Sequence, residues 1–331
     1  MNWSKTSNKM FLSKKISVYF FAIIAFLNAS NVYAEIKITV DKTGNGNFTT
    51  IQEAINSVRA FDPAGSTTIV VKNGIYKEKL VIPEHICNIK ILGEDKEQTI
   101  ITYNDHANTN KMGTFRTYTL QVRGNDITLE NLTIENNAER LGQAVALHTE
   151  GDRIWIKNCK LLGNQDTFYA AGENRRIYVE NSYIEGTTDF IFGGATVWFE
   201  YCDIYCKQNS YITAASTAKT VKYGFIFNNC KINVAENVTS MFLGRPWRAY
   251  GMTVFMNCEL PKEINPKGWH NWDKQENEKT ARYFEYNNSG EGSKITQRVT
   301  WVKILSKRES KKITKEKVLN DFFAKITQNQ Y

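Results

Sequence analysis

The sequence predicts an all-β fold: a right-handed parallel β-helix, wound as a single-stranded solenoid, with a short capping helix and a C-terminal tail packed along it. A six-residue unit recurs, in the order apolar, polar, mostly Asn, small or apolar, variable, apolar. Its copies begin 20–28 residues apart, which is the period of one solenoid coil. Strands rich in β-branched and aromatic residues and broken by Asn and Gly turns fit the same architecture. The copies occupy residues 129–134, 156–161, 179–184, 199–204, 227–232 and 255–260.

The competing all-β architecture is a sandwich of antiparallel strands. It predicts turns about every 8–12 residues and no motif that keeps its register from strand to strand. The unit keeps its register over six copies, which favours the β-helix.

The first 34 residues have the pattern of a secretory signal peptide. Two adjacent lysines precede an apolar run over residues 16–27, and the small residue Ala34 ends the segment. This order is typical of a cleaved leader, and the apolar run is short for a membrane span. An uncleaved anchor is the alternative. We expect residues 1–34 to be removed and residues 35–331 to form one secreted domain, with periplasmic retention left open.

The N-terminal part of that domain predicts strands around one helix. Residues 35–40 alternate apolar and polar as a strand does, and residues 50–60 have the pattern of an amphipathic helix. Thr50, with Glu53 three residues later, fits a capping box. A solenoid needs its terminal apolar layer covered, so we expect this helix to cap one end. Further strands are expected at residues 68–71 and 79–82.

Four of the six cysteines occupy the same position of the repeat unit, namely Cys159, Cys202, Cys230 and Cys258. Stacked inward on successive coils, they would form a buried ladder of small apolar side chains. A disulfide between neighbouring coils is the alternative to free thiols. The pattern assigns no place to Cys87 or Cys206.

After Leu260 the repeat fades. Residues 300–305 are mostly apolar, and residues 314–326 have a helical pattern. No long linker rich in Pro, Gly or Ser interrupts the chain. We therefore expect a tail that packs back along the solenoid and not a second domain.

The net charge of +8 is unevenly distributed. The first 34 residues hold four lysines and no acid, which leaves +4 for the remainder. Residues 303–331 hold eight Lys or Arg against three Asp or Glu. The basic excess is thus a C-terminal feature, interpreted as a solvated helix face, with contact to a polyanion as the alternative. No segment resembles a nucleic-acid-binding motif.

Three polar residues stand at equal spacing near the middle of the chain. Gln143, Asp166 and Asp189 are separated by 23 residues and then by 23 again. This spacing predicts the same place on successive coils, about 4.8 Å apart. Two carboxylates that close repel each other when both are charged, so their pKa values should separate. One would then serve as nucleophile or base and the other as acid.

The surroundings of this row suggest its partners. Asp189 precedes the apolar residues 190–192 and needs a positive partner to stay charged. Arg245, 56 residues further on, is the candidate because that distance is two repeats of 28. Gln143 and Gln165 carry amide N–H donors suited to an oxyanion.

Spacing alone leaves other chemistries open. Glycoside hydrolases also use paired carboxylates, and acidic clusters on a β-helix can bind calcium. Asp166 and Asp189 could instead be turn residues that hydrogen-bond to their own backbone.

Five motifs resemble those of the pectin methylesterase, or pectinesterase, family, and they occur in that family's order over residues 36–322. The last two are long and specific. The motifs are Gly74-x-Tyr-x-Glu78, Gln143-Ala-Val-Ala-Leu147, Gly163-x-Gln-Asp-Thr167, Gly186-Thr-x-Asp-Phe-Ile-Phe-Gly193 and Leu243-Gly-Arg-Pro-Trp247. The resemblance implies a right-handed parallel β-helix that hydrolyses the methyl esters of galacturonic acid in pectin, giving pectate and methanol.

The resemblance also implies a role for each candidate. Asp189 matches the family's nucleophile. Asp166 matches the acid that protonates the departing methoxide and then activates water. Gln143 and Gln165 match the residues that bind the oxyanion, and Arg245 matches the residue that orients Asp189. The family implies no metal and no organic cofactor.

Flat aromatic side chains are the candidates for binding sugar rings. Trp247 matches a residue of the family's substrate cleft, and Trp269 is assigned to the cleft as well, with core packing as the alternative for both. Phe168, Tyr169 and Phe190 flank the carboxylates and are weaker candidates for lining the groove.

Several other motif residues are given no catalytic role. Tyr76 and Glu78 are expected to be structural, and His148 is expected to be a scaffold or groove residue. Thr188 stands where an apolar residue is common in the family, and His148 stands where plant members usually have Arg. These departures leave the preferred substrate pattern in doubt but not the reaction.

Three competing functions remain. A β-helix lyase or polygalacturonase would cut the polymer itself. A polysaccharide-binding relative without activity would have lost Asp166, Asp189 or Arg245, and an esterase for another acyl group would keep them. We expect a monomer that acts on pectin, with no nucleic-acid partner and no membrane partner once the leader is removed.

Overall fold

The computed structural model describes residues 35–62 and 67–328, and the predicted signal peptide lies outside these residues. The described residues belong to one compact unit. None of the helices in this part of the chain is long and apolar enough to cross a membrane.

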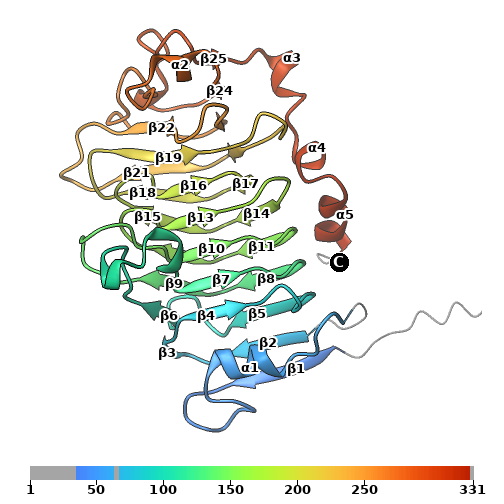
Figure 1. Cartoon of the computed structure of the whole chain (residues 1–331). Coiled ribbons are helices and arrows are strands. Elements are labelled where there is room, and N and C mark those ends of the chain that lie inside the picture. Colours follow the sequence, from blue (N-terminus) through green and yellow to red (C-terminus); the bar gives the residue numbers. More distant parts are fainter. Residues whose placement is uncertain (1–34, 63–66, 329–331) are drawn as a thin grey trace, which may run out of the picture. The chain divides into compact units, whose positions relative to one another are not determined.

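The chain winds through three parallel sheets, as Figure 1 shows for the strands labelled along the coils. Each full coil gives one strand to sheet A, the next to sheet B and the third to sheet C. Sheet A has eleven strands: β1 (Ile36–Val40), β2 (Thr67–Val71), β5 (Ile89–Gly93), β8 (Ile127–Glu130), β11 (Ile154–Lys157), β14 (Arg176–Glu180), β17 (Thr196–Glu200), β20 (Phe225–Asn228), β23 (Met252–Met256), β24 (Arg282–Tyr286) and β25 (Lys303–Ile304).

The other two sheets have seven strands each. Sheet B contains β3 (Gly74–Lys77), β6 (Thr99–Tyr103), β9 (Thr133–Asn136), β12 (Lys160–Leu162), β15 (Tyr183–Gly186), β18 (Asp203–Cys206) and β21 (Lys231–Val234). Sheet C contains β4 (Leu80–Ile82), β7 (Leu120–Val122), β10 (Leu147–Thr149), β13 (Phe168–Ala170), β16 (Ile191–Gly193), β19 (Tyr211–Ala215) and β22 (Phe242–Pro246). This arrangement confirms the predicted parallel β-helix and excludes the antiparallel sandwich.

The repeat unit spans the turn from sheet A to sheet B. Its third residue has a left-handed backbone in all six copies, with φ between 48° and 56°. Asn tolerates that conformation better than most residues do, which explains why it recurs at this position. The side chains also join coils, since Asn158 Nδ2 donates to Asn131 Oδ1 at 2.7 Å. Tyr201 takes the Asn position in one copy and is 61% exposed.

The first residue of the unit points into the core. Phe199, Phe227 and Phe255 stack on successive coils with ring centroids 4.3 and 4.4 Å apart. The four cysteines of the repeat are buried and free, as the ladder of core thiols predicts. Cys206 is also buried and free, whereas Cys87 is half-buried.

The capping helix α1 (Ile51–Ser57) begins where the sequence predicts and ends three residues earlier than expected. Thr50 Oγ1 accepts from the N–H of Glu53 at 3.4 Å. The Glu78 carboxylate accepts from the N–H groups of Ile51 and Gln52, at 3.0 and 3.1 Å. It satisfies donors that a helix N-terminus leaves free, so Glu78 has the structural role expected of it.

The C-terminal tail lies along the outer face of sheet A, where Figure 1 shows α4 and α5 beside the edge of the coils. The predicted single helix is two, α4 (Lys315–Leu319) and α5 (Asp321–Gln328). Asn320 separates them, because its backbone angles of φ 54° and ψ −126° are incompatible with a continuous helix. Val318, Leu319, Phe322 and Ile326 pack against an aromatic strip of sheet A, and each such burial contributes about 1.5–3 kcal/mol.

The remaining helices are short. They are α2 (Gln275–Glu278), α3 (Lys307–Ser310) and the 3-10 turns η1 (Thr109–Lys111), η2 (Thr114–Arg116) and η3 (Glu291–Ser293).

Candidate active site

The two carboxylates lie on neighbouring coils at the start of sheet C. Phe168 of β13 pairs with Ile191 of β16, and each follows a carboxylate by two residues. Asp166 and Asp189 therefore hold equivalent positions, as the 23-residue spacing predicts. They are 8% and 6% exposed, so both charges are largely removed from water.

Gln143 does not share this position, and that part of the prediction is wrong. Leu147 of β10 pairs with Phe168, an offset of 21 residues and not 23. Nearer the carboxylates, the N–H of Ala144 donates to Gln165 O, which places Ala144 beside Asp166 and Gln143 one residue before it. The equal spacing is misleading because the segment from Ala144 to Leu147 holds one residue more than the segment from Asp166 to Phe168 beside it, so the register changes there.

Both aspartates have a left-handed backbone, with φ 67° at Asp166 and 50° at Asp189. Asp is among the few residues that tolerate this conformation. The backbone N–H of Asp166 donates to Thr188 O at 3.1 Å, and that of Asp189 donates to Tyr211 O at 2.8 Å. These bonds run to the next coil, so the open interpretation of turns closed by the carboxylates themselves does not describe the site.

Arg245 grips the Asp189 carboxylate with two hydrogen bonds. Nε donates to Oδ1 at 3.0 Å and Nη2 donates to Oδ2 at 2.6 Å. A two-point contact of this kind is stronger and better directed than a single ion pair. The predicted pairing over 56 residues is confirmed.

The position of Arg245 follows from the register of sheet C. Arg245 pairs with Ala214, which in turn pairs with Phe192. The side chain of Ala214 is only a methyl group, so the guanidinium can reach back over β19 to Asp189. Its flat faces are covered by Tyr211 and Trp272, whose ring centroids lie 3.9 and 3.8 Å from Cζ. These cation–π contacts hold the guanidinium in one orientation.

The surroundings of the two carboxyl groups give them different pKa values. Burial raises the pKa of Asp166 well above its ordinary value, the charge of Asp189 raises it further, and Arg245 opposes both only in part. Burial also raises the pKa of Asp189, but there the hydrogen bonds and the charge of Arg245 act directly against it. The pKa of Asp166 is therefore raised more than that of Asp189, so Asp189 ionises first and Asp166 keeps its proton to higher pH.

Gln143 and Gln165 are half-buried beside the pair. Gln165 directly precedes Asp166, and its carbonyl accepts from the N–H of Ala144 at 3.1 Å. Within residues 35–62 and 67–328, neither side-chain amide has a hydrogen-bond partner. Both amides are therefore free to donate to an oxygen placed over the carboxylates.

An aromatic surface adjoins the carboxylates on the outer face of sheet C. Tyr169 and Trp247 are partly buried there around Phe192. Tyr169 stacks on Phe192 with centroids 4.5 Å apart, and Trp247 meets Phe192 edge-on at 5.9 Å. Phe115, 48% exposed, lies 5.0 Å from Tyr169. The surface offers apolar faces of the kind that the sugar-binding prediction requires.

Three aromatic predictions are wrong. Phe168, Phe190 and Trp269 are fully buried in the main core and cannot line a groove. Phe168 points inward because side chains alternate along a strand, which leaves Tyr169 outside. Trp269 donates its indole N–H to Glu285 at 2.9 Å inside the fold.

Three aromatic residues near the carboxylates were not predicted from the sequence, namely Phe115, Phe192 and Trp272. Phe192 follows Asp189 by three residues, as Tyr169 follows Asp166 by three, so the repeated offset could have identified it. Trp272 follows Trp269 by three residues, and the choice between them needs the structure.

His148 lies beneath the aromatic surface. Its ring centroid is 4.6 Å from that of Tyr169. Burial lowers the pKa of His148 to about 4, so the imidazole is neutral near pH 7. This agrees with a scaffold role.

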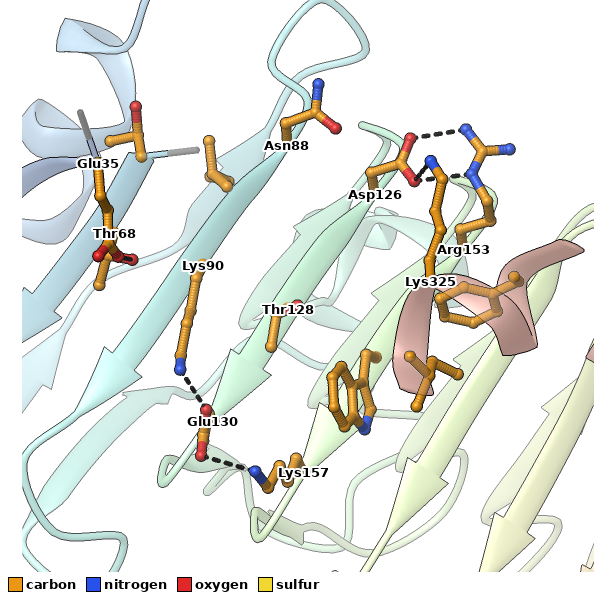
Figure 2. A pocket seen from close by; sticks show the side chains of 15 residues that line it. Glu35, Thr68, Asn88, Lys90, Asp126, Thr128, Glu130, Arg153, Lys157 and Lys325 are labelled. Carbon is orange, nitrogen blue, oxygen red and sulfur yellow. Dashed lines mark hydrogen bonds and ion pairs between the residues drawn. The ribbon is translucent and has the colours of Figure 1, made fainter. Parts of the chain in front are cut away.

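A cavity of about 510 Å³ lies elsewhere, on the outer face of sheet A beside α5 (Figure 2). Each of its four cations contacts a carboxylate. Asp126 accepts from Arg153 and Lys325, and Glu130 contacts Lys90 and Lys157, as the dashed lines in Figure 2 show. The cations hold the pKa values of Asp126 and Glu130 below their usual range against the effect of burial.

Comparison with known proteins gives a consistent result. A family model described as Pectinesterase matches residues 37–322. Pectinesterase 31 of Arabidopsis thaliana is 36% identical over 82% of this chain and 89% of its own length. Pectinesterase 5 of the same plant is 37% identical over 82% of this chain, which spans only 48% of that relative. The solved structure of pectin methylesterase from carrot superposes with a TM-score of 0.84 and 29% identity, over 89% of this chain and 96% of the carrot chain.

Proposed function

Because this chain belongs to the pectinesterase family of carboxylic ester hydrolases, which de-esterify pectin, we propose that it hydrolyses the methyl esters of galacturonic acid residues with Asp189 as nucleophile and Asp166 as acid and base. One observation carries the assignment of roles. An ionised carboxylate gripped at two points by Arg245 stands beside a second buried carboxyl group whose pKa is raised. Such a pair supports covalent catalysis with proton transfer.

In the first step, an Asp189 oxygen attacks the ester carbonyl carbon. The carbonyl π electrons move to oxygen, and the side-chain amides of Gln143 and Gln165 donate hydrogen bonds to that oxyanion. When the tetrahedral intermediate collapses, the bond to methoxide breaks and Asp166 gives its proton to the leaving oxygen. Methanol departs, and the acyl group remains on Asp189 as an anhydride.

In the second step, the Asp166 carboxylate takes a proton from water. The hydroxide so formed attacks the acyl carbon, the same two amides stabilise the oxyanion, and the bond to Asp189 breaks. Asp189 returns as a carboxylate and Asp166 returns protonated. The products are a free galacturonate carboxyl group and methanol, and the polymer backbone stays intact.

The aromatic surface beside the carboxylates is the proposed sugar-binding surface. Tyr169 and Trp247 offer half-buried rings around Phe192, and the C–H faces of a sugar ring are apolar enough to pack against them. We further propose that the protein is exported, acts as a monomer and meets pectin outside the cytoplasm.

The test is methanol release from highly methylated homogalacturonan, followed together with polymer length. Wild type should release methanol without shortening the polymer, and Asp189→Ala should release none. Asp203→Ala, a change of an exposed aspartate on β18, is the matched control and should keep full activity. Shorter polymer would point to a chain-cutting enzyme, and wild type that releases no methanol would overturn the proposal.

A further inference from the structure

We propose that the two turns that follow β19 and β22 form a second binding surface, which holds the free carboxylates of de-esterified galacturonan next to the active site. The surface consists of Lys219, Lys222, Arg248, Arg282 and Lys312 with the aromatic rings beside them, and is called the basic turn surface below. The identity of the polymer rests on the proposed function.

The two turns, residues 216–222 and 247–251, lie against each other as they lead from sheet C to sheet A. The N–H groups of Trp247 and Arg248 both donate to Ala215 O, at 2.9 and 3.3 Å. At the other end of the turns, Met252 N–H donates to Thr217 Oγ1 at 3.2 Å. The turns therefore present one continuous surface.

Arg282 of β24 donates hydrogen bonds to both turns. Nε donates to Tyr250 O at 3.0 Å, Nη1 to Val221 O at 2.7 Å and Nη2 to Ala218 O at 3.1 Å. All of these partners are backbone carbonyls, which accept hydrogen bonds but carry no net charge. Arg stays protonated in proteins, so a full positive charge remains beneath the turns.

Above Arg282, each of three exposed cations lies over an aromatic ring. Lys219 Nζ is 5.5 Å from the Tyr250 centroid, and Lys222 Nζ is 4.8 Å from that of Tyr223. Arg248 Cζ is 4.6 Å from the Trp247 centroid. Trp247 and Tyr250 are half-buried, so each can pack against the C–H face of an acidic sugar while the neighbouring cation meets the carboxylate. Tyr223 is 8% exposed and serves only to position Lys222.

The C-terminal tail adds a further positive charge. Tyr223 Oη donates to Lys312 O at 3.4 Å, which brings the exposed basic segment around α3 against the same turns. In the part of the chain that the structure describes, none of the five cations forms an ion pair. The cavity of Figure 2 is the contrast, since each of its four cations contacts a carboxylate.

The basic turn surface begins at the active site. Arg248 directly follows Trp247, whose ring meets Phe192 at the edge of the aromatic surface. A stretch of polymer that has lost its methyl esters could thus remain bound by its carboxylates while the next ester reaches Asp189. The surface would favour de-esterification of successive residues and would not alter the chemical step.

The test compares two double variants with equal charge change. Lys219→Gln with Lys222→Gln removes two charges from the basic turn surface, and Lys37→Gln with Lys77→Gln removes two exposed charges at the opposite, N-terminal end of the solenoid. Binding of the purified protein to fully de-esterified polygalacturonate is measured at about 50 and 300 mM salt, since screening separates charge contacts from other contacts.

We expect the turn variant to bind at least fivefold more weakly than wild type at low salt, with a smaller salt dependence, and the control variant to stay within twofold. The control variant should also keep the initial rate of methanol release from highly methylated polymer. Equal weakening in the two variants would mean a general effect of net charge, and unchanged binding in the turn variant, or no binding by wild type, would likewise overturn the inference. Absence of methanol from wild type would refute the proposed function alone, because polygalacturonate contains no ester.

Discussion

Arg245 and Asp189 are joined by two hydrogen bonds of 3.0 and 2.6 Å, although 56 residues separate them in the chain. Two coils of the solenoid carry the chain from one to the other, and the small Ala214 lies between their strands. The guanidinium both orients the carboxylate and favours its ionised form against the effect of burial.

Arg245→Lys should therefore lower kcat strongly. Lysine keeps the charge but cannot make the two-point contact or fit as a flat group between Tyr211 and Trp272. We expect a loss of about 100-fold, in the range for breaking a buried, hydrogen-bonded charge pair. Methanol release and thermal unfolding of the same preparation provide the measurement.

Arg153→Lys is the matched control. Arg153 contacts Asp126 with the same two-point geometry, at 2.7 and 2.7 Å, but on sheet A. Its replacement should leave kcat unchanged. Equal losses in both variants would show that activity depends on general stability and not on the Arg245 contact.

The pH dependence of kcat/KM should be bell-shaped. The rate should rise with pH as Asp189 ionises, and fall as pH rises through the raised pKa of Asp166, because the leaving methoxide then finds no proton. The two carboxyls interact, so the limbs belong to the pair. Initial rates of methanol release between about pH 3 and 9 test this, and a rate that stays level at high pH would contradict the role of Asp166 as acid.

Much of the fold could be predicted from the sequence because the residue types of the repeat unit indicate the conformation and orientation of each of its positions. An apolar first residue recurs in all six copies, Asn at the left-handed turn in five and Cys at the fourth position in four, so one coil predicts much of the next. The C-terminal helix was harder, since a single left-handed residue, Asn320, divides a continuous amphipathic pattern into two helices.

The candidate site was only partly predictable. Asp166, Asp189 and Arg245 lie within the regular coils, where spacing translates into contact. Gln143 precedes a segment in which the register between neighbouring coils slips by one residue, so its spacing did not translate into register. Burial of an aromatic residue next to a carboxylate depends on which way a strand alternates, and two adjacent residues such as Phe168 and Tyr169 have opposite outcomes.

The two tryptophans of the segment from 269 to 272 should separate stability from activity. Trp269→Ala empties a fully buried site and should lower the free energy of unfolding by about 3–5 kcal/mol. Trp272→Ala removes one face of the Arg245 contact. It should lower kcat about tenfold, in keeping with a cation–π contact of up to about 2 kcal/mol, and have a small effect on unfolding.

Denaturant unfolding and methanol release measure both effects. Trp272→Phe keeps an aromatic face against Arg245 and should restore most of the lost kcat. A Trp272→Ala variant with full activity would show that Tyr211 alone is enough to orient the guanidinium.

Asp166→Asn should make the protein more stable at neutral and alkaline pH. Burial raises the folded-state pKa of Asp166 above the unfolded value of about 3.9. The contribution of this carboxyl to stability is therefore fully present below about pH 4 and is lost as pH rises through the folded-state pKa.

Asn cannot ionise, so Tm of the variant should exceed that of wild type at pH 8, by about 2–4 °C for each kcal/mol, and approach it at pH 4. Asp203→Asn, at an exposed position of β18, should show no such pH-dependent difference. A variant less stable than wild type at pH 8 would mean that the folded protein prefers the ionised form of Asp166, which would rule out this residue as the proton donor.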